Sequence, residues 1–293
     1  MKENDKNFIG IIGAAGQTGI PILNRLIKKG IKVRAIIHKE SQKDKLPKNI
    51  ETAIADNRNK NSLLQAMKGL NTVYYIPPVF IEEEVEFGKN VLESAIETGC
   101  YRLVYHSVMH SKTPSMPHHW KKYQVEELIR KSDIVWTIVQ PSMYSQTPLS
   151  FMNHKNLKLN AGFDDKKIFT PIDLRDLAEA VSNILTEKGH EYKVYELAGK
   201  ERLDLREMSQ IIGKIVNKEI KIVRIPSLIV AIAAAYKLKS KEIFTIKAML
   251  DYYNKNGFEG NSKDLIDILR HEPHTFYETM QYELKNKNFD RNY

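Results

Sequence analysis

The chain has 293 residues, of which 42% are hydrophobic and 28% charged, a mixture typical of a globular protein with a substantial core. Its single cysteine, Cys100, excludes a disulfide within the chain. The formal charge of +9 comes from lysines spread along the sequence without a basic tail, which argues against a nucleic-acid partner. The longest apolar run, residues 228–236, falls short of the about 20 residues of a membrane span and predicts a buried helix segment. Residues 1–13 contain no signal-peptide core, so we expect a cytoplasmic protein with no membrane partner.

Strand and helix patterns alternate through the first half of the chain. Short apolar runs predict strands at residues 7–13, 32–38, 50–56, 71–78, 102–108 and 133–141. Amphipathic stretches between them predict helices at residues 17–30, 60–69, 82–99 and from 117 onward. Such alternation requires right-handed crossovers and a parallel sheet covered on both faces. We therefore expect an α/β, doubly wound Rossmann core over residues 1–150.

The pattern loosens in the second half. Helices are predicted at residues 173–189 and 204–218, and strands at 192–199 and 220–226. The remainder, from residue 227, reads as helical, with a break at 254–262 and a last helix at 275–284. Residues 151–293 are thus expected to add strands to the sheet and to form a smaller, mainly helical C-terminal substrate lobe, interleaved with the core as one structural unit.

The segment "GAAGQTG" follows the first predicted strand and precedes the first helix. Gly13 permits the sharp turn out of the strand, Gly16 lets the backbone approach a pyrophosphate, and Gly19 lets helix and strand pack closely. The helix N-terminus offers unpaired N–H groups to phosphates, and Gln17 and Thr18 can add side-chain donors. The spacing differs from G-x-G-x-x-G, but its position predicts a dinucleotide-binding turn.

The end of the second strand predicts which dinucleotide is bound. Proteins that select NAD place an acidic residue there to bind the ribose 2′-hydroxyl. Here His38 and Lys39 stand at this place, with no acid before Glu40, and Arg34 lies upstream. These three basic residues suit a 2′-phosphate, so we expect NADP(H) in preference to NAD(H). Asp56, at the end of the third strand, is expected to bind the adenine.

Ligands of doubly wound sheets sit at the carboxyl ends of the strands. This rule adds further candidates from the ends of the fourth, fifth and sixth strands. The expected cofactor contacts are Ile76, Pro77, Pro141 and Met143, and the expected substrate contacts are Pro78, His106 and Tyr144.

The helix that begins "PHHWKKYQVEEL" carries polar residues on its inward face. On a helical wheel, His118 and Lys122 fall in the same stripe as the apolar Val125 and Ile129. A lysine on a buried stripe needs a partner. One interpretation makes Lys122 a ligand of the cofactor ribose. The other pairs Lys122 with Glu126 at spacing i, i+4 and leaves His118 as a residue of the helix start.

Five segments together resemble the NmrA-like branch of the atypical short-chain dehydrogenase/reductases. They are "GAAGQTG", "NTVYYIPP", "YRLVYHSV", "KYQVEELIRKSDIVWTIVQPSMY" and "LRHEPHTFYETM". The resemblance covers nearly the whole chain. It implies a Rossmann domain that binds NADP(H) and a small C-terminal substrate lobe. The family includes quinone reductases, other NADPH-dependent reductases and redox sensors that bind the cofactor without evident catalysis.

The resemblance also implies roles for single residues. The family's serine after the fifth strand corresponds to Ser107, and its lysine corresponds to Lys122. Catalytic short-chain dehydrogenases carry a tyrosine four residues before that lysine, where this chain has His118. This departure argues against the usual Tyr–Lys proton transfer, although a histidine can donate a proton near neutral pH. We therefore take Lys122, His118 and Ser107 as the candidate catalytic residues.

Two functions fit these patterns. The first is an NADP(H)-dependent oxidoreductase that transfers a hydride to a small electrophile, such as a quinone or another aromatic compound. The alternative is a redox sensor that binds NADP(H) without turnover and acts through a protein partner. A zinc site built from His106, His110, His118 and His119 is a third reading, with His106 and His110 on one face of the fifth strand. Since no carboxylate or nearby cysteine has ligand spacing, no metal is expected.

Overall fold

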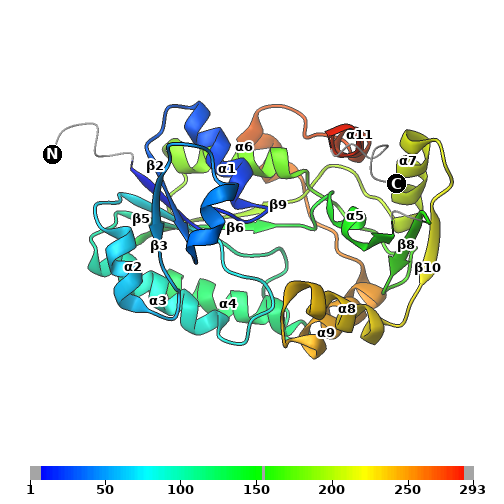
Figure 1. The fold of residues 1–293 in the computed structure, drawn as a ribbon, viewed down its shortest axis with the longest axis horizontal. Coiled ribbons are helices and arrows are strands. Elements are labelled where there is room, and N and C mark those ends of the chain that lie inside the picture. Colours follow the sequence, from blue (N-terminus) through cyan, green and yellow to red (C-terminus); the bar gives the residue numbers. More distant parts are fainter. Residues whose placement is uncertain (1–7, 154–155, 287–293) are drawn as a thin grey trace. The chain divides into compact units, whose positions relative to one another are not determined.

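The computed structural model describes residues 8–153 and 156–286, and these residues divide into two compact units (Figure 1). The first unit comprises Met1–Lys112, His119–Gln140 and Leu177–Tyr195. The second unit comprises Thr113–His118, Pro141–Asp176 and Glu196–Tyr293. The chain therefore passes between the units several times.

A seven-stranded sheet organises the first unit, in the order β3-β2-β1-β4-β5-β6-β9. Its strands are β1 (Ile9–Ile12), β2 (Val33–Ile37), β3 (Glu51–Ile54), β4 (Thr72–Tyr75), β5 (Arg102–His106), β6 (Val135–Pro141) and β9 (Lys193–Leu197). Every neighbouring pair from β3 to β6 is parallel. The strand order reverses between β1 and β4, which is where doubly wound folds bind their ligands. The predicted α/β Rossmann fold is confirmed.

Helices cover both faces of this sheet (Figure 1). They are α1 (Gly19–Lys28), α2 (Lys60–Met67), α3 (Glu84–Glu97), α4 (Pro117–Arg130) and α6 (Leu174–Thr186). On one face, α2, α3 and α4 bury a core that includes Leu63, Val91, Val125 and Ile129. On the other face, α1 and α6 are joined by an ion pair between Arg25 and Glu179, whose nearest atoms lie 2.7 Å apart. A 3₁₀ helix, η2 (Glu40–Lys45), follows β2.

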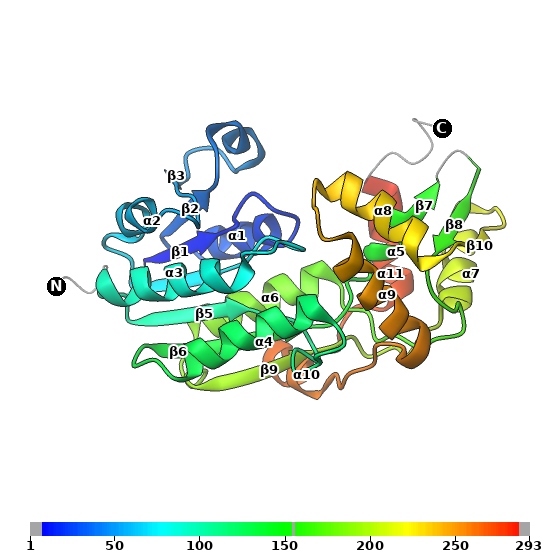
Figure 2. The ribbon, with the colours of Figure 1, turned by 90° about the horizontal axis from the view of Figure 1, so that it is seen from below.

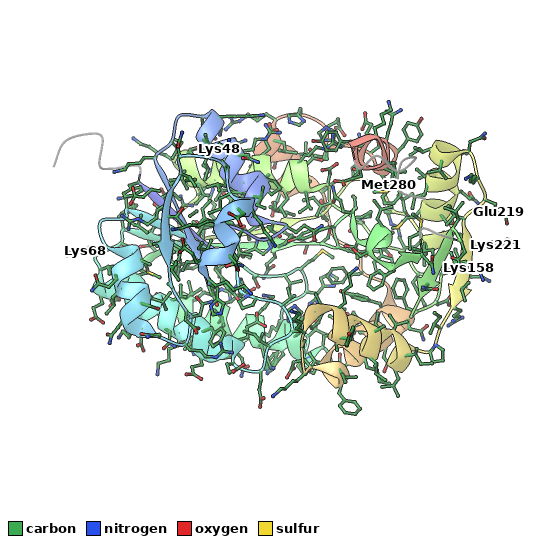
Figure 3. The ribbon with its side chains drawn as sticks, viewed as in Figure 1. Lys48, Lys68, Lys158, Glu219, Lys221 and Met280 are labelled. Atoms are coloured by element: carbon green, nitrogen blue, oxygen red, sulfur yellow. The ribbon has the colours of Figure 1, made fainter. Side chains whose placement is uncertain are left out.

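The second unit is mainly helical and has a small sheet of its own (Figure 2). Its elements are α5 (Thr147–Phe151), β7 (Met152–Asn153), β8 (Lys158–Ala161), α7 (Leu205–Val216), β10 (Lys221–Arg224), α8 (Ser227–Leu238), α9 (Ile243–Asn256), α10 (Lys263–Leu269) and α11 (Phe276–Asn286). β10 runs parallel to β8 and β7 runs antiparallel to it. Lys158 and Lys221 are register partners in this sheet (Figure 3).

The second half of the chain departs from the sequence expectations in two places. The predicted strand at 192–199 joins the main sheet as β9, but the strand at 220–226 forms β10 of the separate small sheet. The segment 228–236 forms α8, as predicted, yet only one of its faces is buried. Ile229, Ile232 and Tyr236 are 56%, 49% and 88% exposed. The run carries no polar residue to mark an outer face, so its sequence alone suggested burial on all sides.

None of the helices in the described ranges is long and apolar enough to cross a membrane.

Candidate active site

In the turn after β1, a side chain at each of the three glycines would meet a different steric constraint. Gly13 has φ +82°, and a Cβ there would lie 2.7 Å from the carbonyl oxygen of Ile76, which follows β4. A Cβ on Gly19 would lie 2.5 Å from the carbonyl oxygen of Gly13, so α1 packs directly on the turn. Gly16 is exposed, and a Cβ there would meet only the Gly13 oxygen, at 3.2 Å. The turn therefore lies at the reversal of strand order, with open space above Gly16.

The first turn of α1 is prepared for an anion. Within the described chain, it contains no acidic residue and receives no side-chain cap from Thr18. The first N–H groups of a helix have no intrahelical acceptor, and the helix dipole adds a partial positive charge at this end. Gln17 is exposed, whereas Thr18 is only 9% exposed. The sequence expectation for this turn thus has a matching geometry, although the contacts of Gln17 and Thr18 with a cofactor stay a prediction.

The residues after β2 form a short basic loop. His38 and Lys39 are both exposed, and their backbone N–H groups donate to Oε1 of Gln42 at 2.8 and 3.2 Å. These bonds fix the backbone of the loop, and both basic residues are exposed. Glu40, the acid that follows, forms an ion pair with Lys43 at 2.6 Å.

Arg34 does not join this loop. Its guanidinium pairs with Glu51 of β3 at 2.6 Å and also donates to the carbonyl oxygens of Ala66 and Lys68, both at 2.8 Å. Because Arg34 is the second residue of β2, its side chain lies along the early part of the strand and not at its carboxyl end. The guanidinium of Arg34 thus already has protein partners, and the expected phosphate contacts of Arg34, His38 and Lys39 stay predictions.

The carboxyl ends of β3 and β4 carry the next group of expected contacts. The Asp56 carboxylate accepts from the N–H of Arg58 at 2.9 Å and remains partly exposed. Ile76 is half-buried, Pro77 is buried and Pro78 is exposed. Their contacts with adenine, ribose and substrate stay predictions.

Lys122 is buried in an ion pair that the sequence did not predict. Its Nζ lies 2.7 Å from Oε1 of Glu84, and the side chains are 4% and 0% exposed. The alternative prediction, an i, i+4 ion pair between Lys122 and Glu126, is wrong, since Lys122 pairs with Glu84. The inward stripe of α4 is confirmed, since His118, Lys122, Val125 and Ile129 are all at most 6% exposed. The role of Lys122 toward a ribose stays a prediction.

The packing of α3 against α4 explains this ion pair. A Cβ on Gly88 of α3 would lie 2.6 Å from Val125 of α4, so only glycine allows this approach. Glu84 precedes the buried Phe87, Gly88 and Val91 of α3 at spacing i, i+3, i+4 and i+7. That stripe is the sequence signal that could have identified Glu84 as the buried member of the run Glu82–Glu83–Glu84.

Two tyrosines lie beside the Lys122–Glu84 pair. The rings of Tyr75 and Tyr105 are tilted by 31° with 5.7 Å between their centroids, and the Lys122 ammonium lies 6.0 Å from the centroid of the Tyr105 ring. Burial, and after it the charge of Glu84, raises the pKa of both phenols well above the usual value. In the described part of the chain, neither hydroxyl has a hydrogen-bond partner. Both phenols therefore stay protonated and keep a donor available.

Glu126 organises a second polar group beneath the end of β5. It accepts from the Ser107 hydroxyl, from Nε2 of Gln140 at 2.8 Å, and from the guanidinium of Arg130 at 2.8 Å. Gln140 also donates to the Ser111 hydroxyl at 3.1 Å. The Ser107 hydroxyl donates its hydrogen bond to Glu126, so its oxygen can act toward a further group only as an acceptor. A catalytic part for Ser107 stays a prediction, and Glu126 is a residue that sequence reasoning missed.

His106 ends β5 as a neutral imidazole. Its Nδ1 lies 2.6 Å from the Tyr74 hydroxyl. Burial, and after it the positive charge of Lys122, lowers the pKa of His106 from 6.5 to about 3. The imidazole therefore carries no charge near neutral pH. Its expected contact with a substrate stays a prediction.

The four other expected residues belong to the second unit. His118 is 6% exposed in the first turn of α4. Pro141 is buried, and Met143 and Tyr144 are half-buried on the segment after β6, where the Met143 carbonyl accepts from the N–H of Ile172 at 2.9 Å. Their contacts with cofactor or substrate stay predictions.

The histidines are not arranged as the metal reading required. β5 ends at His106, so His110, with φ +56°, does not share a strand face with it, and that expectation is wrong. His119 uses Nδ1 to contact the Met109 carbonyl at 3.0 Å. Across the ranges that the structure describes, no three His, Cys, Asp or Glu side chains are grouped to hold a metal ion.

A model of the NmrA-like family matches residues 5–282. The chain belongs to the NmrA-like family. The match covers both units, so the resemblance inferred from five short segments is confirmed over almost the whole sequence.

Curated relatives of this NmrA-like protein include two reductases. Quinone oxidoreductase 2 of Escherichia coli is 26% identical over 220 residues, which are 73% of this chain and 76% of the relative. NAD(P)H azoreductase of Xenophilus azovorans is 22% identical over 226 residues, covering 74% and 77%.

Solved structures share the fold. The Escherichia coli NADPH-dependent quinone oxidoreductase in complex with NADPH superposes with a TM-score of 0.81 at 22% identity, covering 94% of this chain and 99% of that one. The Citrobacter triphenylmethane reductase in complex with NADP(H) gives a TM-score of 0.80 at 20% identity, with coverage of 94% and 99%.

Proposed function

We propose that the protein is an NADP(H)-dependent oxidoreductase that transfers a hydride to a small electrophile, with a quinone as the leading candidate. The names of the relatives support this class: a quinone oxidoreductase, an azoreductase and a triphenylmethane reductase, two of them crystallised with NADPH or NADP(H). The geometry of the cofactor site in this chain supports the same class independently of those names.

The observation that carries the proposal is the turn from Gly13 to Gly19. It combines a positive φ at Gly13, open space above Gly16 and backbone contact at Gly19 with an uncapped helix N-terminus at the reversal of strand order. Each of these is what a dinucleotide pyrophosphate requires. The residues present therefore fit NADP(H), which when bound supplies the hydride.

The basic loop after β2 supports NADP(H) over NAD(H). His38 and Lys39 are exposed at the place where an acid would bind a free 2′-hydroxyl, and Glu40 is already paired with Lys43. A phosphate gains charge-assisted hydrogen bonds from such a pair, whereas a hydroxyl gains little.

The Lys122–Glu84 pair gives the nicotinamide end of the site a fixed cation. Glu84 holds one N–H of the ammonium at 2.7 Å, which leaves two further N–H groups to reach ribose hydroxyls. In this arrangement Glu84 positions Lys122 and compensates its charge in a buried setting. His118 lies one turn before Lys122 on the same helix and is the candidate donor of the proton that completes reduction.

Cofactor affinity tests this proposal. We expect calorimetric titration to give tighter binding for NADPH than for NADH. The double change His38→Asp/Lys39→Ala should remove about 1.5–3 kcal/mol of NADPH binding, since the phosphate loses its partners. NADH binding should stay the same or become tighter, since the new Asp can accept a hydrogen bond from the ribose 2′-hydroxyl. Lys68→Ala, an exposed lysine on the same unit, is the matched control and should change neither affinity. Equal affinities of the native protein for the two cofactors would contradict the proposal.

A further inference from the structure

Helix α8 presents a row of large apolar side chains to solvent. We call Leu228, Ile229, Ile232 and Tyr236 the α8 apolar face; their exposed fractions are 39%, 56%, 49% and 88%. Ile229, Ile232 and Tyr236 are three and four residues apart, and Leu228 precedes Ile232 by four, which places all of them along one side of the helix. Phe244, at the start of α9, is 79% exposed. Isolated exposed apolar residues are common, but a continuous row of this kind indicates an interaction surface.

The opposite side of α8 already supplies the packing that the fold needs. Val230, Ala231 and Ala235 are at most 7% exposed. α8 and α9 pack side by side (Figures 1 and 2). Val230 of α8 and Leu250 of α9 both contact Gly162, since a Cβ placed on that glycine would lie 3.2 Å from each of them. The α8 apolar face therefore lies outside the contact between α8 and α9 and remains exposed.

Lysines surround one end of the α8 apolar face. Lys237, Lys239 and Lys241 follow Tyr236 at alternate positions, and all three are exposed. Lys237 also donates to the Ser150 carbonyl at 3.3 Å. Lys239 adopts φ +55° and ends the helix, so the chain turns back into α9 at this end. Glu242, the acid in this segment, accepts from the Thr245 hydroxyl at 2.6 Å. The segment is thus apolar along its length and cationic at one end.

We propose that the α8 apolar face docks on an anionic lipid bilayer, with the helix lying in the plane of the interface. Interfacial helices combine a buried apolar side with lysines that reach anionic headgroups. Twelve residues of helix extend for about 18 Å, too short to cross the roughly 30 Å hydrocarbon core. Tyr236 and Phe244 stand beside the lysines, where aromatic side chains enter the headgroup region. The expectation of no membrane partner rested on the inability to span, which leaves surface binding open.

The charges favour lipid over a second copy of the chain. A symmetric contact through the lysine end would bring Lys237, Lys239 and Lys241 against the same residues of another molecule. An acidic protein partner would be recognised through specific hydrogen bonds. The α8 apolar face has one polar side-chain group for such bonds, the Tyr236 hydroxyl. A fluid bilayer needs no such pattern. The inference stands apart from the proposed reductase activity, because docking is measured without cofactor or acceptor.

Co-sedimentation with vesicles tests the docking. The full chain should bind vesicles made of equal parts phosphatidylglycerol and phosphatidylcholine, bind pure phosphatidylcholine much more weakly, and release in high salt. Ile232→Asp should weaken binding at least tenfold. Changing Lys237, Lys239 and Lys241 to Gln should weaken it on the order of 10²-fold, at about fivefold for each lysine. Tyr236→Ser with Phe244→Ser is a second apolar variant, since both side chains are almost fully exposed.

Matched controls lie on the first unit. Ile96→Asp changes an isoleucine of α3 with 47% exposure, close to that of Ile232, and should not alter binding. Replacing the exposed Lys48, Lys68 and Lys188 by Gln removes the same charge elsewhere and should have a smaller effect than the α8 set. Lys48 and Lys68 are labelled in Figure 3.

Three results would overturn the proposal. The native chain fails to bind anionic vesicles; or Ile232→Asp and Tyr236→Ser/Phe244→Ser, folded by circular dichroism, bind as well as the native chain; or the native chain is a dimer by size-exclusion chromatography that Ile232→Asp converts to monomer, which assigns the face to a second copy.

Discussion

At the scale of single residues, Lys122 and Glu84 form a buried ion pair that stabilises the fold, and Lys122 is also the residue that we propose as a ligand of the cofactor ribose. Both side chains are almost fully removed from water and face each other at 2.7 Å. Losing one member of such a pair leaves an uncompensated buried charge, which costs several kcal/mol, whereas replacing both costs much less. Lys122→Ala should therefore destabilise the fold, unlike the same substitution at a solvent-exposed lysine.

A double-mutant cycle separates the two roles of Lys122. Lys122→Met and Glu84→Gln should each lower the free energy of unfolding, the first by about 3–5 kcal/mol, and the double variant should recover much of that loss. If Lys122 also binds the ribose, the double variant should still bind NADPH about 1.5–3 kcal/mol more weakly than the native protein. Chemical denaturation and calorimetric titration measure the two quantities. Native affinity in the double variant would assign Lys122 a purely structural role.

His106 predicts a pH dependence of stability. Its pKa is about 3 in the folded protein and 6.5 in the unfolded chain. Between these values the unfolded state binds more protons, so this contribution to stability is complete above pH 6.5 and is lost as pH falls toward 3. Between pH 6.5 and 5 the loss should be roughly 1.5 kcal/mol.

The comparison with His106→Asn isolates this group from the carboxylates, which titrate at lower pH. The asparagine keeps an acceptor for the Tyr74 hydroxyl but has no titrating nitrogen. Denaturation curves for the variant should show a flatter dependence on pH in this window. If the free energy of unfolding depends on pH equally in the native protein and in His106→Asn, a group other than His106 takes up the proton.

At the scale of an element, two substitutions in the turn between β1 and α1 should have different effects, one on cofactor binding and the other on the stability of the fold. Gly16→Ala adds a Cβ that meets only one atom, at 3.2 Å, on the side expected to face the pyrophosphate. It should weaken NADPH binding at least tenfold and change the melting temperature little. Gly19→Ala forces a Cβ within 2.5–2.7 Å of the backbone of Gly13 and Ala14, so it should destabilise the fold markedly. Calorimetric titration and thermal melts of both variants check this; undiminished NADPH affinity in Gly16→Ala would count against the pyrophosphate site.

The sequence predicted those features that depend on local periodicity. The strands and helices of the first unit, the turn at Gly13 and the inward stripe of α4 through Lys122 all follow from short repeats or spacing. The pairing of Lys122 with Glu84 does not, because it joins residues 38 positions apart whose approach depends on Gly88 packing against Val125. Likewise the commitment of Arg34 to Glu51 depends on strand pairing, which no local pattern shows.

The second unit shows the same division. Its longer helices were predicted, but α5, β7 and β8 are too short to leave a periodic signal. The exposure of α8 was missed for a different reason. Its residues are apolar on both sides, so the sequence could not tell which side lacks a neighbour. Where a helix has no polar face, only the tertiary structure distinguishes core from interaction surface.

At the scale of the whole molecule, turnover is the property that distinguishes an oxidoreductase from a cofactor-binding sensor. Both functions require the turn at Gly13–Gly19, and the relatives in the NmrA-like family share the fold. Hydride transfer additionally requires that an acceptor reach the nicotinamide and be reduced there. A sensor, in contrast, is expected to bind NADPH tightly without oxidising it.

The most direct measurement is the rate of NADPH oxidation, followed by absorbance, with a panel of quinones as acceptors. We expect saturable, quinone-dependent oxidation by the native protein, slower oxidation of NADH, and activity at least tenfold lower in Gly16→Ala under the same conditions. Tight NADPH binding with no oxidation of the cofactor by any quinone in the panel would contradict the account.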